Sequence, residues 1–175
     1  MKTLKIKKTS IFALSVAILM SFTLMAPLGA SAFSFNKANS TQPSIVDIVL
    51  KDDGEFDVLQ AAVVRAGLVN ALNGSGQYTV FAPTDAAFVK TLGVANEADA
   101  IGAVNSLPID QLTNILTYHV REGRLYSLAV LVRPGYKMLN GEVLSRKEVL
   151  NAGIAKVNVP AKNGVVHVIN SVLFP

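Results

Sequence analysis

The segment Val165-Val166-His167-Val168-Ile169 sets the strictest condition on the fold. Its β-branched residues predict a strand, and the side chains of a strand alternate between its two faces. Val165, His167 and Ile169 then share one face, while Val166 and Val168 share the other. A strand that is apolar on both faces belongs inside a sheet, so we predict an internal strand here.

Other runs predict partner strands. Residues 155–159 form a second β-branched run, and the turn residues Asn163-Gly164 separate it from residues 165–169. We therefore predict a pair of strands, followed by a last strand-like run over residues 172–174. Residues 78–81 predict another short strand. Asn140-Gly141 predicts a hairpin, because Asn and Gly tolerate the positive φ that a two-residue turn requires.

The first half of the chain shows helical patterns instead. Apolar residues recur at helical spacing in residues 45–49, 55–66, 85–92 and 109–118. Ser44 can cap the first of these helices. From His119 onward, short strand-like runs and turn signals replace the helices. Because helices and strands are segregated along the chain, we predict an α+β fold.

The amino terminus carries the signature of an export leader. The chain has 16 Lys+Arg, 12 Asp+Glu and a net charge of +4, yet four lysines lie within the first eight residues. An uncharged apolar run, residues 11–26, and the sequence Ala30-Ser31-Ala32 follow. We predict a signal peptide over residues 1–32, cleaved after Ala32, with an uncleaved membrane anchor as the alternative. A flexible lead-in over residues 33–43 would follow it.

The remaining chain, without the leader, gives no support for a nucleic-acid partner. Its basic and acidic residues are equal in number, so the excess positive charge belongs to the leader. The acidic residues fall mostly in residues 44–110 and the basic ones in residues 111–175. If the two halves remain separate in space, this polarity predicts head-to-tail self-association.

No catalytic, metal or cofactor pattern emerges from the sequence. The chain contains no cysteine and only two histidines, which excludes disulfides, thiol catalysis and a three-histidine zinc site. Residues 52–57 are acidic but do not match the spacing of a calcium-binding EF-hand loop. Gly74-Ser75-Gly76 lacks the strand-turn-helix setting of a nucleophile elbow. Glycosylation sequons begin at Asn39 and Asn73, and they matter only in a eukaryotic secretory pathway.

Three segments in a fixed order resemble a known family. They are Tyr-Thr-Val-Phe-Ala-Pro-Thr-Asp-Ala-Ala-Phe (78–88), Leu-Thr-Asn-Ile-Leu-Thr-Tyr-His-Val (112–120) and Asn-Gly-Val-Val-His-Val-Ile-Asn-Ser-Val-Leu-Phe-Pro (163–175). Together they resemble the two sequence boxes and the intervening Tyr-His motif of the fasciclin (FAS1) domain family. The resemblance covers residues 44–175, which we predict to be a single FAS1 domain.

The resemblance implies a wedge-like β-sheet core packed with several short helices. It also implies a non-enzymatic adhesion module that is secreted, extracellular or periplasmic, or associated with the cell surface. Its partner would be an extracellular protein, a surface or a matrix component. No transmembrane span would remain after leader cleavage. The alternative is a carrier of a small apolar ligand, because some family members bind carotenoids. The family-motif positions, with a structural or adhesion-related role, are Thr79, Phe81, Ala82, Pro83, Thr84, Asp85, Phe88, Tyr118, His119, Asn163, Gly164, His167, Ile169, Leu173 and Pro175.

Two of these positions have competing interpretations. His167 is either a buried histidine with satisfied hydrogen bonds or a ligand-binding residue. Tyr118-His119 ends a predicted helix, where a cationic imidazole would suit the helix dipole and tie the helix end to the Thr84-Asp85 corner. In animal relatives, however, the resemblance connects this segment with integrin-dependent adhesion. The chain contains no Arg-Gly-Asp sequence.

Overall fold

A computed structural model describes residues 42–51 and 53–175. The predicted leader, residues 1–32, and most of the predicted lead-in lie outside this range. The helices are α1 (Ile45–Val49), α2 (Asp57–Arg65), α3 (Val69–Leu72), α4 (Asp85–Leu92), α5 (Glu97–Ser106), α6 (Ile109–Tyr118), α7 (Ser127–Val132) and α8 (Arg146–Ala152). The strands are β1 (Tyr78–Pro83), β2 (Val120–Glu122), β3 (Gly135–Lys137), β4 (Val143–Ser145), β5 (Ile154–Ala161) and β6 (Gly164–Ile169).

A four-stranded sheet in the order β2-β1-β6-β5 organises these elements. Strand β6 lies between β1 and β5, so the predicted internal strand is confirmed. β1 and β6 run parallel, in a register that pairs Tyr78 with Gly164 and Pro83 with Ile169. The outer strands β2 and β5 are antiparallel to their neighbours. β3 and β4 form a separate antiparallel hairpin.

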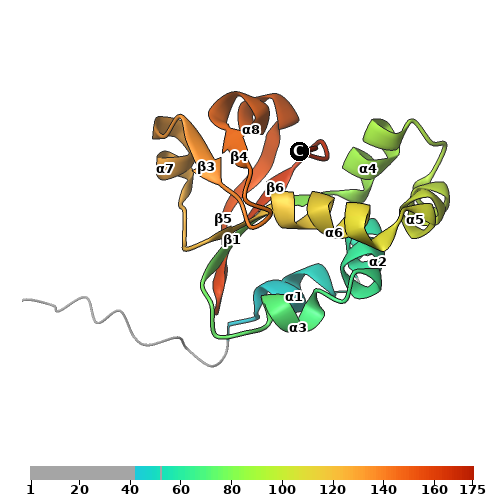
Figure 1. The fold of residues 1–175 in the computed structure, drawn as a ribbon, viewed down its shortest axis with the longest axis horizontal. Coiled ribbons are helices and arrows are strands. Elements are labelled where there is room, and N and C mark those ends of the chain that lie inside the picture. The colour runs from blue at the N-terminus through green and yellow to red at the C-terminus, as the bar shows by residue number, and fades with distance from the viewer. Residues whose placement is uncertain (1–41, 52) are drawn as a thin grey trace, which may run out of the picture. The chain divides into compact units, whose positions relative to one another are not determined.

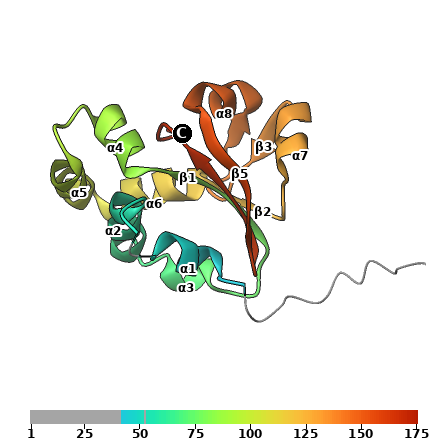
Figure 2. The ribbon, with the colours of Figure 1, turned by 180° about the vertical axis from the view of Figure 1, so that it is seen from behind.

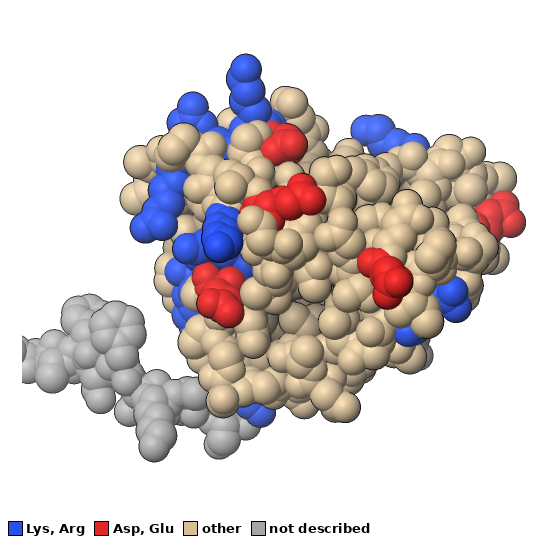
Figure 3. Space-filling view, viewed as in Figure 1, with Lys and Arg blue, Asp and Glu red and all other residues tan. Residues whose placement is uncertain are grey.

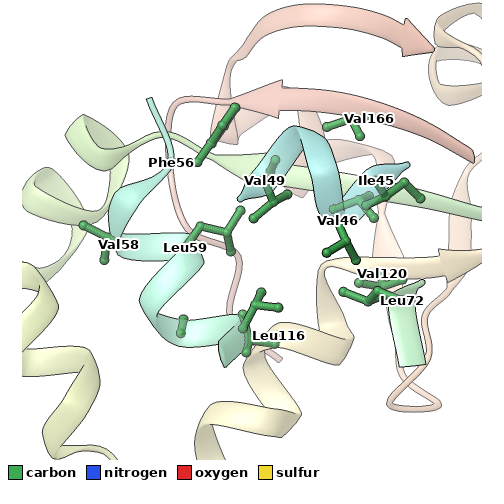
Figure 4. Close-up of a cluster of buried hydrophobic side chains, with 14 of the residues drawn as sticks. Ile45, Val46, Val49, Phe56, Val58, Leu59, Leu72, Leu116, Val120 and Val166 are labelled. Carbon is green, nitrogen blue, oxygen red and sulfur yellow. The ribbon is translucent and has the colours of Figure 1, made fainter. Parts of the chain in front are cut away.

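The sheet separates two apolar cores. Side chains of β1 and β6 such as Val80 and Val166 pack against α1, α2 and α6, and Figure 4 shows Ile45 and Leu116 in this first core. Phe81 and Ile169 point to the opposite face, where a second core contains residues of α7, α8 and the β3-β4 hairpin. Figures 1 and 2 show these two groups of elements on opposite sides of β1, β5 and β6. The α+β class is therefore confirmed.

Local sequence signals explain several boundaries. The N–H of Asp47 donates to Ser44 Oγ (3.1 Å), and the N–H of Ser44 donates to Asp47 Oδ2 (2.8 Å), which completes a capping box at α1. The predicted helix over residues 109–118 is confirmed at both ends as α6. The strand pair of residues 155–159 and 165–169 is also confirmed, as antiparallel β5 and β6.

The second half of the chain is less strand-rich than predicted. It contains α7 and α8, and residues 172–174 form no strand. The signal for α8 is a Ser-x-x-Glu capping box, in which the N–H of Glu148 donates to Ser145 Oγ (3.3 Å). The Asn140-Gly141 hairpin exists, but β3 and β4 pair at Lys137 and Val143, so the connection is longer than the predicted two residues. Helix α5 was absent from the sequence prediction.

Candidate functional site

The first family motif forms a corner between β1 and α4. Thr84 caps α4, because the N–H of Ala87 donates to its Oγ1 (3.2 Å). Asp85 reaches a different helix: its Oδ1 accepts the N–H of Val58 (2.9 Å), and its Oδ2 accepts the N–H of Asp57 (3.1 Å). Phe56, at the start of α2, offers no side-chain cap. Asp85 thus satisfies two of the free N–H groups at the start of α2 from a distant part of the chain.

Thr79 fastens the loop that follows β2. Its hydroxyl donates to the carbonyl oxygen of Gly123 (2.6 Å) and accepts the N–H of Leu125 (2.8 Å). Thr79 is fully buried. Its side chain therefore holds the backbone of residues 123–125 against β1.

The Tyr-His motif lies at the end of α6, with both side chains buried. Nδ1 of His119 donates to the carbonyl oxygen of Ile115 (2.8 Å), while Nε2 accepts the N–H of Leu173 (2.9 Å). A ring that donates at one nitrogen and accepts at the other is neutral. Consistently, burial lowers the pKa of His119 to about 4.

Two expectations for His119 are thus wrong. The imidazole is not a cation at physiological pH, because desolvation lowers its pKa by more than the hydrogen bond to the Ile115 backbone raises it. It also ties α6 to the carboxyl-terminal segment at Leu173 and not to the Thr84-Asp85 corner. Its backbone also contacts the first motif strand, where the N–H of Phe81 donates to the His119 carbonyl oxygen (2.9 Å).

His167 has the hydrogen-bonded, buried setting that the structural interpretation predicted. Its Nε2 donates to the carbonyl oxygen of Leu125 (2.8 Å), and its Nδ1 accepts the N–H of Asn158 (3.3 Å). The ring stacks on Phe81 with a centroid separation of 5.5 Å. Burial lowers the pKa of His167, so this imidazole is also neutral.

The last motif opens with a second long-range cap. Asn163 accepts the N–H of Ile45 at Oδ1 (2.9 Å) and donates from Nδ2 to the carbonyl oxygen of Leu72 (2.6 Å). It therefore joins α1 to the end of α3. At Gly164 a Cβ would lie 2.1 Å from the carbonyl oxygen of Tyr78, so the close approach of β1 and β6 requires glycine there.

Most motif positions are interior. Thr84 is half-buried and Pro175 is exposed. The buried positions are Thr79, Phe81, Ala82, Pro83, Asp85, Phe88, Tyr118, His119, Asn163, Gly164, His167, Ile169 and Leu173. The motifs therefore come together around the sheet and the ends of α1, α2 and α6, and their side chains build the scaffold.

The sequence did not predict one cluster of acidic side chains. Carboxylate oxygens of Asp57, Asp85 and Glu97 all lie within 4.8 Å of one another. Desolvation, followed by the negative charges of Asp85 and Asp57, raises the pKa of Glu97. Both oxygens of Asp85 already accept backbone N–H groups. We interpret the cluster as part of the α2 cap, brought together by folding from residues far apart in sequence.

Two small apolar cavities flank His119. One, of about 20 Å³, lies among residues of α1, α2 and the sheet; the other, of about 30 Å³, lies between α2, α4 and α6. Each has room for about one water-sized probe. In the part of the chain that the structure describes, no helix has the length and apolarity needed to cross a membrane.

The family model described as Fasciclin domain matches residues 54–175. The chain is 42% identical to the transforming growth factor-beta-induced protein ig-h3 of Sus scrofa over 73% of its own length, but that match spans only 19% of the pig protein. It is 33% identical to the immunogenic protein MPB70 of Mycobacterium bovis, over 93% of this chain and 90% of that one.

A solved structure supports the same fold. A FAS1 domain pair from the insect cell adhesion molecule Fasciclin I superposes with a TM-score of 0.55. The match covers 76% of this chain and 51% of the insect chain, at 14% sequence identity. At that identity the likeness concerns the fold alone.

Proposed function

The chain belongs to the fasciclin domain family, and from this membership we propose that it is a non-enzymatic binding module that mediates cell–cell, cell–surface or matrix contacts. Its place of action would be extracellular or periplasmic, at or near a cell surface. The identity of the partner is a separate question, because the chain spans only a small part of the pig relative.

The main support for this proposal is that polar side chains of the family motifs form their hydrogen bonds inside the domain. Asp85, Asn163, His119 and His167 each make two hydrogen bonds, all to backbone groups. A catalytic base needs a lone pair that can reach a substrate. Because both imidazoles lack one, we expect binding through the outer surface and no catalysis.

Adhesion can be tested with the purified chain on beads. We expect the beads to attach to cells or extracellular material of the source organism, while beads carrying the same chain after heat unfolding do not attach. Equal attachment of folded and unfolded protein, or none by either, would contradict the proposal.

The Tyr-His motif needs its own test, because integrin-dependent adhesion is connected with this segment in animal relatives. We propose a structural role for Tyr118 and His119, since both are buried. His119→Ala should therefore lower the melting temperature, and bead attachment should weaken only where the variant is partly unfolded. Lost attachment at an unchanged melting temperature would contradict the structural role.

The alternative function, carriage of a small apolar ligand such as a carotenoid or lipid, has less to support it. Ligand pockets usually measure about 300–1,000 Å³. The apolar cavities beside His119 measure about 20 and 30 Å³. A ligand could therefore enter either of these two cavities only if α1, α2 or α6 separated from the sheet. Colour or lipid that copurifies with the native protein would favour this alternative over adhesion.

A further inference from the structure

Helix α7 turns an apolar face to solvent. Leu128 and Val132 are 73% and 69% exposed, and Leu131 between them is 48% exposed. Residues spaced by three and four positions lie on one side of a helix, so these three side chains form a single face. Tyr126, at the N-cap, is 52% exposed beside them. We call Tyr126, Leu128, Leu131 and Val132 the α7 face.

The α7 face is held in place by the domain beneath it. Val130 points inward and is buried in the second core. The N–H of Ser127 donates to Asn158 Oδ1 (2.8 Å), which ties the helix start to β5. The Tyr136 hydroxyl donates to the Val130 carbonyl oxygen. The exposed side chains therefore project from a fixed helix, and their exposure is a property of the folded domain.

Basic residues outnumber acidic ones around this face, although Glu142 lies in the neighbouring hairpin and Glu148 on α8. Residues 123–141, which include α7 and β3, contain no Asp or Glu but do contain Arg124, Arg133 and Lys137. From α8, the Arg146 guanidinium donates to the Leu131 carbonyl oxygen (3.2 Å). Figure 3 shows Lys and Arg side chains gathered at the upper left, where Figure 1 places α7 and α8.

The α7 face is a projection at the margin of the domain. In both ribbon views α7 lies at the outer edge, on the opposite side of the sheet from α1 and α2. Val143 adds a further apolar side chain, 64% exposed, from the neighbouring hairpin. An exposed apolar helix face with basic residues beside it matches an interfacial helix, which inserts apolar side chains below the headgroups while cations contact the lipid phosphates.

We propose that the α7 face docks the domain onto the surface of an anionic lipid bilayer. Leu128, Leu131 and Val132 would enter the headgroup boundary, and Arg133, Lys137 and Arg146 would contact anionic headgroups. The charge complementarity selects a lipid surface rich in negative headgroups. This inference does not rest on the proposed adhesion role, since adhesive contacts can use other parts of the surface.

Vesicle binding tests the proposal with the chain purified from the extracellular fraction. We expect cosedimentation with vesicles of equal phosphatidylcholine and phosphatidylglycerol, and much weaker binding to phosphatidylcholine alone. Leu128→Ser together with Val132→Ser should reduce the partition coefficient more than about tenfold. Val64→Ser, at a side chain that is 56% exposed on α2, should leave it unchanged.

The contribution of charge has a matched pair of variants. Lys137→Gln should weaken binding about fivefold, as expected for one cation at an anionic surface. Lys90→Gln changes an exposed lysine on α4 and should have no effect. Equal effects of the two lysine changes, or equal binding to both kinds of vesicle, would show that negative headgroups do not attract this face. Either result would overturn the proposal.

A dye can report which face inserts. Because the chain has no cysteine, Leu128→Cys and Val64→Cys each provide a single labelling site. An environment-sensitive dye at position 128 should shift to shorter wavelength with phosphatidylglycerol vesicles, and the dye at position 64 should not. Equal shifts or none would overturn the proposal. So would concentration-dependent self-association that is lost in the Leu128→Ser, Val132→Ser variant, since a second copy would then occupy the face.

Discussion

The family motifs supply internal hydrogen-bond partners for backbone groups that would otherwise be unsatisfied. Among the described residues, no buried side-chain nitrogen or oxygen lacks a partner. An unpaired buried polar group costs about 1–3 kcal/mol, so replacing Asp85, His119 or Asn163 affects stability before it affects any surface contact. The individual residue type matters here because each side chain pairs with two specific groups.

The neutral state of His119 predicts that stability depends on pH. Its pKa is about 4 in the folded protein and near 6.5 when unfolded, so the unfolded chain binds the proton more tightly. Stability is then greatest above pH 6.5 and falls as the pH drops toward 4. Between pH 7.5 and 5 the loss from His119 should be about 2 kcal/mol.

Urea denaturation at both pH values would measure this loss. His119→Gln retains hydrogen-bonding capacity without titrating, so its stability should change less between the two pH values. A wild-type stability that stays constant or rises on acidification would show that His119 is not held neutral.

Two glycines should respond oppositely to alanine. At Gly164 the added Cβ would meet the Tyr78 carbonyl oxygen at 2.1 Å, so Gly164→Ala should cost about 3 kcal/mol or more. At Gly102, on α5, nothing lies within 4 Å of the new Cβ, and Gly102→Ala should stabilise by about 0.5–1 kcal/mol. Thermal melting of both variants would check the contrast, and similar shifts would refute it.

At the scale of elements, α2 depends on a cap that lies outside its own sequence. The Asp85 carboxylate accepts the N–H groups of Asp57 and Val58. In Asp85→Asn the side-chain NH2 would face one of these two N–H groups, and two donors cannot form a hydrogen bond. The variant should lose about 1–2 kcal/mol of stability. Asp110→Asn, an exposed change in the first turn of α6, is the control, with an expected effect below about 0.5 kcal/mol. Urea midpoints that shift equally would contradict the capping role.

Sequence periodicity predicted the elements whose polar and apolar faces are distinct. Helix α6 was predicted over its full length, because its apolar residues recur at helical spacing. Helix α7 was not, because the apolar run Ser-Leu-Ala-Val-Leu-Val has no polar face and resembles a strand. Only packing against the second core determines that Val130 is buried while Leu128 is exposed.

The candidate site shows a similar division. The sequence motifs identified Asp85, His119 and Asn163, but their partners in α1, α2 and the carboxyl-terminal segment lie far away along the chain. Glu97 was not singled out, because only folding brings its carboxylate beside Asp57 and Asp85. Local sequence patterns do not predict such long-range contacts, so the roles of these residues could be identified only from the three-dimensional structure.

At the scale of the whole molecule, two cores share one sheet. Consecutive residues of β1, Val80 and Phe81, belong to different cores, and so do Val168 and Ile169 of β6. Disrupting either core therefore disturbs strands that the other core also uses. We expect the described domain to unfold in a single cooperative transition.

Matched substitutions can test this cooperativity. Leu116→Ala in the first core and Leu144→Ala in the second should each cost about 2–5 kcal/mol, with one transition in both variants. Circular dichroism follows the helices, and tyrosine fluorescence includes Tyr118 and Tyr136 of the second core. Transitions that separate between the two signals would show that the cores unfold independently.

The parallel pairing of β1 with β6 also determines when folding can finish. During synthesis, residues 78–83 emerge early, yet their partner strand consists of residues 164–169. The central ladder cannot close until those residues leave the ribosome, and such distant pairing forms slowly. Until then residues 78–83 lack their parallel partner, so neither core can complete its packing while the chain is still being synthesised.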